Sequence, residues 1–151
     1  MVLSVKKEKL YSESLYQATK SDLLFKHGCI ATYGGKIIAK GHNTYKSYSG
    51  NDDFIDNQCS CHAEMGVMRR ICYNNREKKH KLNRIMKKTK LYISRSSAGG
   101  KSTNSAPCVK CLNIIKEYNI RKIIFCFNDE YFEYNSKDYF TEHINYRGYK
   151  Y

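Results

Sequence analysis

Two short groups of residues have the types and the spacing to bind a metal ion and use it. Cys108 and Cys111 stand three residues apart behind Pro107, the only proline of the chain, where a helix is expected to begin. At this spacing both thiols lie on one face of the first helical turn, beside backbone N–H groups that favour thiolates. His62, at the start of a second predicted helix, would supply a third ligand. The three side chains predict an S,S,N zinc site, and an open fourth position is typical of catalytic zinc.

Glu64, two residues after His62, lies within reach of the same site. Zinc lowers the pKa of bound water to about 7, so that hydroxide is available at neutral pH. A carboxylate nearby can take the proton of that water and return it to a leaving group, which is typically worth about 10²–10⁴ in rate. We therefore predict one catalytic zinc ion with Glu64 as the proton shuttle. Cys59 and Cys61 could hold a second ion, although thiols near a pocket more often have no metal.

The elements that must position these residues are read from apolar patterns and turn residues. Helices are predicted over 6–26, 61–74 and 107–118, and strands over 29–33, 36–40, 91–94, 122–127 and 131–134. Gly34 and Gly35 make the first two strands a tight hairpin, and the link 128–130 is so short that the last two strands must be antiparallel. The order predicts one domain over 1–151, an α/β fold: a three-layer α/β/α sandwich with a mixed five-stranded sheet, an N-terminal β-hairpin and helices on both faces.

The two motifs together resemble the zinc signature of the cytidine deaminase superfamily, H-x-E followed by P-C-x-x-C. The chain has His-Ala-Glu at 62–64 and Pro-Cys-Val-Lys-Cys at 107–111, and the order of elements over 6–127 also fits. The resemblance implies that His62, Cys108 and Cys111 bind zinc and that Glu64 moves the proton. The implied reaction is attack of zinc-bound hydroxide on C4 of cytosine, which releases ammonia and leaves uracil.

The same resemblance implies three substrate contacts. Asn43 falls just after the second strand, where family members usually place an asparagine that touches the base or the ribose. The main chain of Ala63 would help to hold the base. Ser105 lies in the segment before the second motif, which shapes the pocket in the family and contacts the exocyclic amine. This segment departs from the usual family pattern, and the identity of the substrate is therefore left open.

Three hypotheses for the function follow. An antiparallel last strand is frequent in deaminases of free nucleosides, which favours a (deoxy)cytidine or (d)CMP-type substrate and a role in pyrimidine salvage. The basic charge and the polar loops 41–60 and 96–106 support a polynucleotide deaminase, acting on cytosine or adenine in single-stranded DNA, RNA or tRNA. The third hypothesis is a catalytically inactive nucleic-acid-binding member of the fold, against which the intact Glu64 argues.

The composition limits these hypotheses without deciding between them. The 151 residues are 41% hydrophobic, which excludes general disorder and makes two independent cores unexpected. The apolar runs are far shorter than the roughly 20 residues of a membrane span, and the basic N-terminus does not read as a signal peptide. We therefore expect an intracellular, cytoplasmic protein without a membrane partner. Relatives are often oligomers, so a homo-oligomer is expected.

The net charge of +13 raises the expectation of a polyanionic partner, but the abundance of Lys, Asn, Ile and Tyr is also what an AT-rich genome produces. The basic insertion at 76–90 could follow a phosphate backbone or form a solvated extension of a helix. The polar tail at 135–151 has interleaved aromatic and basic residues, which could stack on bases or simply pack on the domain.

Overall fold

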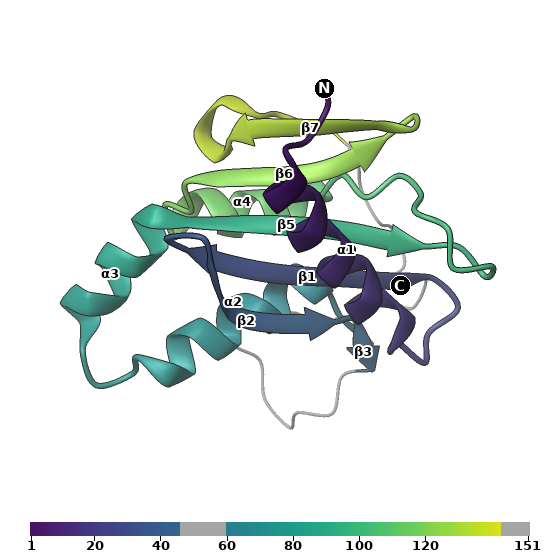
Figure 1. Ribbon diagram of the computed structural model, residues 1–151. Helices are drawn as coiled ribbons and strands as arrows, with labels where there is room; N and C mark the ends of the chain where they lie inside the picture. Colours follow the sequence, from purple (N-terminus) through teal and green to yellow (C-terminus); the bar gives the residue numbers. More distant parts are fainter. Residues whose placement is uncertain (46–59, 143–151) are drawn as a thin grey trace.

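Five strands form one mixed sheet in the order β2-β1-β5-β6-β7 (Figure 1). The computed structural model of the protein describes residues 1–45 and 60–142. Only β5 and β6 are parallel, and the other three neighbouring pairs are antiparallel. The mixed sheet, the N-terminal hairpin and the antiparallel last strand are thus confirmed. The strands are β1 (Lys26–Tyr33), β2 (Lys36–His42), β5 (Thr89–Ser96), β6 (Lys122–Phe127) and β7 (Glu130–Asn135).

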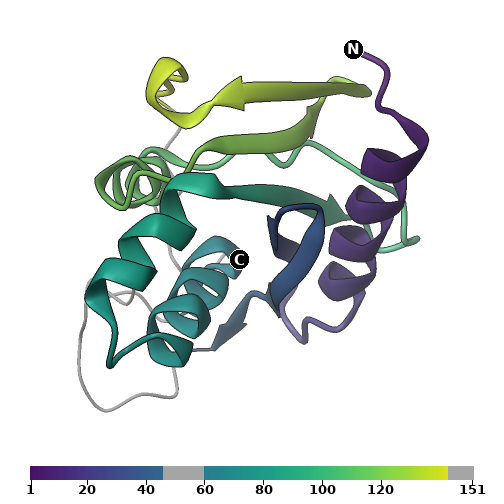
Figure 2. The ribbon, with the colours of Figure 1, turned by 60° about the vertical axis from the view of Figure 1, so that its left-hand side comes forward.

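Helices cover both faces of this sheet, as the sequence predicts. One face packs on α1 through a small apolar cluster that includes Tyr11, Tyr92 and Ile124. The opposite face carries the larger core, which includes residues of α2 and α4 and the buried Met86 of α3. Figure 2 shows α1 on one side of the sheet and the other helices on the other side. The helices are α1 (Val5–Thr19), α2 (Ala63–Asn74), α3 (Lys79–Lys88) and α4 (Val109–Glu117), with a 3₁₀ turn η1 (Ser136–Asp138).

The first helix is shorter than predicted, because a distant residue holds the chain extended. The prediction of a helix over 6–26 is wrong beyond Thr19, and β1 already begins at Lys26. No Gly or Pro marks this end in the sequence. The side chain of Asn43 accepts a hydrogen bond from the N–H of His27 at 2.9 Å and donates one to the carbonyl of Phe25 at 2.7 Å. These tertiary contacts outweigh the local helical preference.

The segment before α2 also differs from its prediction. Two short antiparallel strands, β3 (Thr44–Tyr45) and β4 (Ser60–Cys61), pair where a loop over 41–60 is predicted. The helix predicted from residue 61 consequently begins at Ala63. Most of the predicted loop, 46–59, lies outside the described residues.

The basic insertion at 76–90 contains the separate helix α3, which has a structural inner face. Met86 is buried, and Leu82 and Ile85 pack on the core beside it. The lysines of the outer face are mostly exposed. Among the described residues no helix is long and apolar enough to cross a membrane.

Candidate metal centre

The candidate metal ligands lie at the N-termini of two helices that cover the same face of the sheet. His62 is the N-cap of α2 and Cys108 is the N-cap of α4. Both residues have extended backbone, and neither uses its side chain to cap its helix. Their side chains therefore meet each other instead of folding back on their own helices, and Cys111 joins them from the first turn of α4.

The three side chains form a buried group with the dimensions of a zinc site. Nδ1 of His62 lies 3.0 Å from Sγ of Cys111 and 3.8 Å from Sγ of Cys108, and the three ligand atoms all lie within 4.8 Å of one another. Ligands at the usual zinc distances in a tetrahedron are separated by about 3.6–3.8 Å. The group therefore suits one zinc ion, and it is the one His, Cys, Asp and Glu cluster of this kind in the described part of the chain. Cys59 lies outside that part, as does the side chain of Cys61.

The electrostatics of the group favour the metal-binding thiolate of Cys108, whereas His62 must give up a proton when a metal binds. A hydrogen bond from Cys111, together with contacts from His62, outweighs burial and lowers the pKa of Cys108 to about 4. Burial alone would lower the pKa of His62, but its hydrogen bond with Cys108 and the charges of Glu64 and Cys108 raise that pKa overall. Cys108 is accordingly a thiolate at neutral pH, which is the form that binds a metal.

Glu64 is enclosed beside this group. Its side chain comes from the first turn of α2, and the residue is only 5% exposed. Burial raises the pKa of Glu64 and the charge of Cys108 adds to this, while His62 and a hydrogen bond with Cys111 act in the opposite direction. A buried carboxyl in contact with the ligand side chains can hold a proton and give it up, which is what a general acid–base group requires.

Asn43, which sequence reasoning assigns to the substrate, has its amide bound to the chain itself. The residue is fully buried at the end of β2, and its side chain makes the two hydrogen bonds to residues 25 and 27 described above. Its backbone carbonyl also accepts a hydrogen bond from the hydroxyl of Ser21 at 3.0 Å. Asn43 therefore anchors the start of β1, and its contact with a substrate stays a prediction.

Ser105 has its hydroxyl on the side of the sheet away from the metal ligands. Its Oγ donates to the carbonyl of Ile93 at 2.7 Å, accepts from the N–H of Cys126 at 3.0 Å, and lies 3.2 Å from the hydroxyl of Tyr11 on α1. Ser105 thus links β5 and β6 past the end of the segment in which these two strands pair directly, residues 90–92 with 122–124. A substrate contact of this hydroxyl finds no support in these contacts and stays a prediction, as does the main-chain contact of the buried Ala63.

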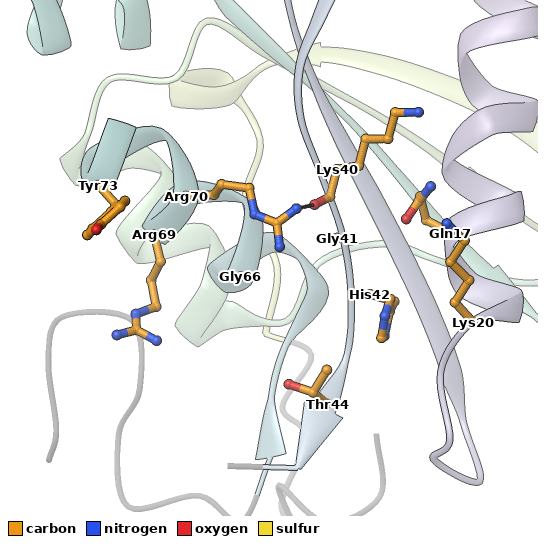
Figure 3. Close-up of a pocket in the computed structure, with 10 residues that line it drawn as sticks. All are labelled: Gln17, Lys20, Lys40, Gly41, His42, Thr44, Gly66, Arg69, Arg70 and Tyr73. Carbon is orange, nitrogen blue, oxygen red and sulfur yellow. Dashed lines mark hydrogen bonds between the residues drawn. The ribbon is translucent and has the colours of Figure 1, made fainter. Parts of the chain in front are cut away.

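A groove beside α2 contains residues that sequence reasoning missed. This β2-edge groove has a volume of about 630 Å³ and lies between α1 and α2 along β2 (Figure 3). It begins at Gly66, one turn after His62, and continues past Arg69 and Arg70. Arg70 donates a hydrogen bond to the carbonyl of Lys40 at 2.8 Å, as the dashed line in Figure 3 shows. The helical spacing of 66, 69, 70 and 73 was the signal that could have revealed this basic face.

A buried His-Cys-Cys group at two helix N-termini, with a buried glutamate beside it, defines a zinc-dependent hydrolase of the deaminase class. The profile of the cytidine and deoxycytidylate deaminase zinc-binding region matches residues 4–127. The chain belongs to this family. No curated protein sequence matches it.

Solved structures of two relatives share the fold. Cytidine deaminase from Burkholderia pseudomallei has a TM-score of 0.59 at 12% identity, over 90% of this chain and 95% of that one. The apo form of dCMP deaminase from the cyanophage S-TIM5 has a TM-score of 0.55 at 18% identity, over 82% of each chain. The same phage enzyme in complex with dCMP and dUMP has a TM-score of 0.54 at 17% identity, again over 82% of each chain. The α/β architecture is thus that of the cytidine deaminases.

Proposed function

We propose that the protein hydrolyses the exocyclic C–N bond of cytosine in a free (deoxy)cytidine or (d)CMP-type substrate, which yields uracil and ammonia. One observation carries this proposal: three buried ligand side chains meet beside a buried carboxyl group. Zinc held by His62, Cys108 and Cys111 would supply a Lewis acid that makes water nucleophilic near neutral pH. The remaining steps belong to residues of the chain.

Glu64 is the residue proposed to move the proton. The reaction forms a C4–O bond and breaks the C4–N bond, so a proton must travel from the water to the departing nitrogen. Glu64 contacts the ligand side chains from the first turn of α2 and can take this proton and return it. Glu64 is only 5% exposed, so its carboxyl is shielded from bulk solvent.

Two observations support a free nucleoside or nucleotide as the substrate. The last strand β7 is antiparallel to β6, an arrangement frequent in relatives that act on free nucleosides. One structurally similar protein, the phage dCMP deaminase, has been solved in complex with dCMP and dUMP. A polynucleotide substrate is the second candidate, favoured by the net charge of +13 and by Arg69 and Arg70 in the β2-edge groove.

The test is deamination of defined substrates by the zinc-loaded protein. Cytidine, deoxycytidine, dCMP and short single-stranded DNA and RNA are incubated with wild type and with Glu64→Gln, and products are read by mass spectrometry. We expect turnover of a small substrate, lost by at least about 10²-fold in Glu64→Gln while its zinc content is unchanged. Glu117→Gln, an exposed glutamate at the end of α4, is the control and keeps full activity.

Conversion of the single-stranded DNA or RNA alone would refute the free nucleoside or nucleotide as the substrate and support the polynucleotide. No conversion of any cytosine substrate by the zinc-loaded protein would refute both. Full activity of Glu64→Gln would refute the assigned proton transfer.

A further inference from the structure

A second basic concavity lies on the α1 face of the sheet, away from the metal ligands. This α1-face pocket has a volume of about 330 Å³ and is lined by five cationic side chains, Lys6, Lys7, Lys88, Lys90 and Arg121. They come from the N-terminus of α1, the C-terminus of α3, the start of β5 and the residue before β6. The pocket also touches the turn between β1 and β2. It therefore lies at the end of the sheet where β5 and β6 begin, on the left in Figure 1.

The strand register places one of these cations, Lys90, beside a further lysine, Lys122, which does not line the pocket. Lys90 of β5 is paired with Lys122 of the parallel strand β6, and like charges on neighbouring strands repel each other. Lys90 is two residues before Tyr92, and Lys122 is two residues before Ile124, so each lysine shares a face with a residue of the α1 cluster. Both lysines are therefore on the α1 face. Such a pairing needs a negative charge nearby.

The chain supplies one carboxylate for this purpose. Glu133 of β7 accepts from Lys7 at 2.6 Å and from Lys122 at 3.2 Å. No ion pair with another acidic residue joins Lys6, Lys88, Lys90 or Arg121 within residues 1–45 and 60–142. Burial, followed by repulsion from Lys7, lowers the pKa of Lys90 overall; Glu133 acts in the opposite direction, and Lys122 and Arg121 add further repulsion. The pocket is thus short of negative charge.

The pocket also offers donors with fixed positions. Ser4 caps α1, a helix of fifteen residues, so the first N–H groups of that helix and its positive dipole end face the same region. Lys6 reaches across to the β1–β2 turn, where a Cβ added to Gly35 would collide with its Nζ. Arg121 is held by backbone hydrogen bonds from its N–H to Thr89 and from Ser136 to its carbonyl. Elements of the fold therefore fix the backbone positions from which these cations line the pocket.

We propose that the α1-face pocket binds a compact anion that carries two or more phosphate groups. Four of the pocket cations have no ion-pair partner among the described residues, and a single phosphate does not carry enough charge to balance them. A di- or triphosphate carries several negative charges in a short chain. Phosphate oxygens accept charge-assisted hydrogen bonds from lysine, arginine and helix N-termini. The convergence of cations from four segments on about 330 Å³ suits a compact ligand, whereas an extended nucleic acid strand requires a row of charges along a surface. This site is independent of the proposed deamination.

Binding of inorganic tripolyphosphate to the full-length protein, measured by isothermal titration calorimetry at about 0.15 M salt, tests the proposal. The double variant Lys90→Gln/Arg121→Gln removes two charges from the pocket. Lys20→Gln/Arg70→Gln removes two from the β2-edge groove and is the matched control. We expect the pocket variant to weaken binding by at least about tenfold, as loss of charged hydrogen bonds would do. The control should stay within about twofold of wild type.

Thermal unfolding provides a second measurement that does not depend on calorimetry. Without ligand, the pocket variant should melt at or above the wild-type temperature, because repulsion between Lys90 and Lys122 is relieved. Tripolyphosphate should raise the melting temperature of wild type and of the control, but not of the pocket variant. Arg121→Gln alone, at an exposed position, should reduce affinity by about threefold, which keeps the test valid if the double variant folds poorly.

Several results would overturn the proposal. Equal loss of binding in both double variants would show a general charge effect, and unsaturable binding in wild type would show no site. Orthophosphate that binds as tightly as tripolyphosphate would exclude a requirement for several phosphates. A single-stranded oligothymidylate that binds more tightly than tripolyphosphate, and loses this in the pocket variant, would assign the pocket to nucleic acid instead.

Discussion

Replacing Ser105 by alanine separates a structural role of this residue from a substrate contact. The hydroxyl makes its hydrogen bonds to the carbonyl of Ile93 and the N–H of Cys126 inside the sheet, and the residue is 2% exposed. Alanine removes only the hydroxyl oxygen, and the space left is too small for a water molecule to replace it. The two backbone groups therefore lose a hydrogen-bond partner. Each buried polar group left in this way costs about 1–3 kcal/mol.

The expected destabilisation by Ser105→Ala is therefore about 2–6 kcal/mol, a large part of the 5–15 kcal/mol that stabilises a typical domain. For a chain of this size such a loss lowers the melting temperature by about 4–24 °C. Ser105 also stands three residues before Cys108, so a displaced segment would weaken zinc binding. The assay is thermal unfolding followed by circular dichroism, with and without zinc, combined with a zinc dissociation measurement.

Ser94 provides a matched control on the neighbouring strand. It is fully buried on β5, and its hydroxyl has no hydrogen-bond partner among the described residues. Ser94→Ala removes the same atom at the same depth, but it leaves no backbone group unpaired, so it should change the free energy of unfolding by less than about 1 kcal/mol in either direction. A Ser105→Ala protein that is as stable as wild type and instead has a raised KM for the deaminated substrate would refute the structural role, because loss of a substrate contact predicts that result.

Three further predictions concern the helix contact, the ion-pair cluster and the metal ligands. Gly28→Ala should cost about 1–3 kcal/mol or more in urea unfolding, because its Cβ would enter the backbone of α1; an unchanged urea midpoint would contradict that close contact. Burial alone would raise the pKa of Glu133, but hydrogen bonds from lysines including Lys122 hold it below its ordinary value. The stabilisation is thus present at neutral pH and is lost as the pH falls through about 4 and below. Glu133→Gln should therefore cost about 1–2 kcal/mol at pH 7 and almost nothing near pH 3, measured by unfolding across that range; a cost independent of pH would exclude the ion pairs as its source. Cys108→Ala should reduce bound zinc, measured by plasma mass spectrometry, from one ion per chain to a small fraction, whereas Cys72→Ala keeps it; full occupancy in Cys108→Ala would refute the ligand assignment.

Much of the fold is predictable because the signals are local. The strand over 122–127 is a short apolar run after a charged residue, and its predicted bounds are those of β6. The β1–β2 turn follows from Gly34 and Gly35, whose φ angles of 59° and 80° only glycine adopts easily. The ligand group is also local in origin, since each ligand lies at the start of a helix whose first turn sets its direction.

The missed features depend instead on contacts between distant segments. The end of α1 is set partly by an amide at position 43, and no residue between 20 and 26 signals it. The α1-face pocket gathers cations that lie far apart in the sequence, and the pairing of Lys90 with Lys122 exists only once the register of β5 and β6 is known. A count of charges over 76–90 detects part of this set but not the place where its members converge.

The same distinction explains why the metal ligands are predicted more securely than the substrate contacts. At a helix N-cap, a side chain can bind a metal if it does not hydrogen-bond to the N–H groups of its own helix. The side chains of His62 and Cys108 make no such bond. A substrate contact requires a polar atom with remaining hydrogen-bonding capacity, and the amide of Asn43 already binds backbone on both its oxygen and its nitrogen. Its nitrogen carries a second hydrogen, so a substrate could be bound through that hydrogen without releasing the start of β1. Substrate recognition and the anchoring of β1 would then share one side chain, and its loss would affect both.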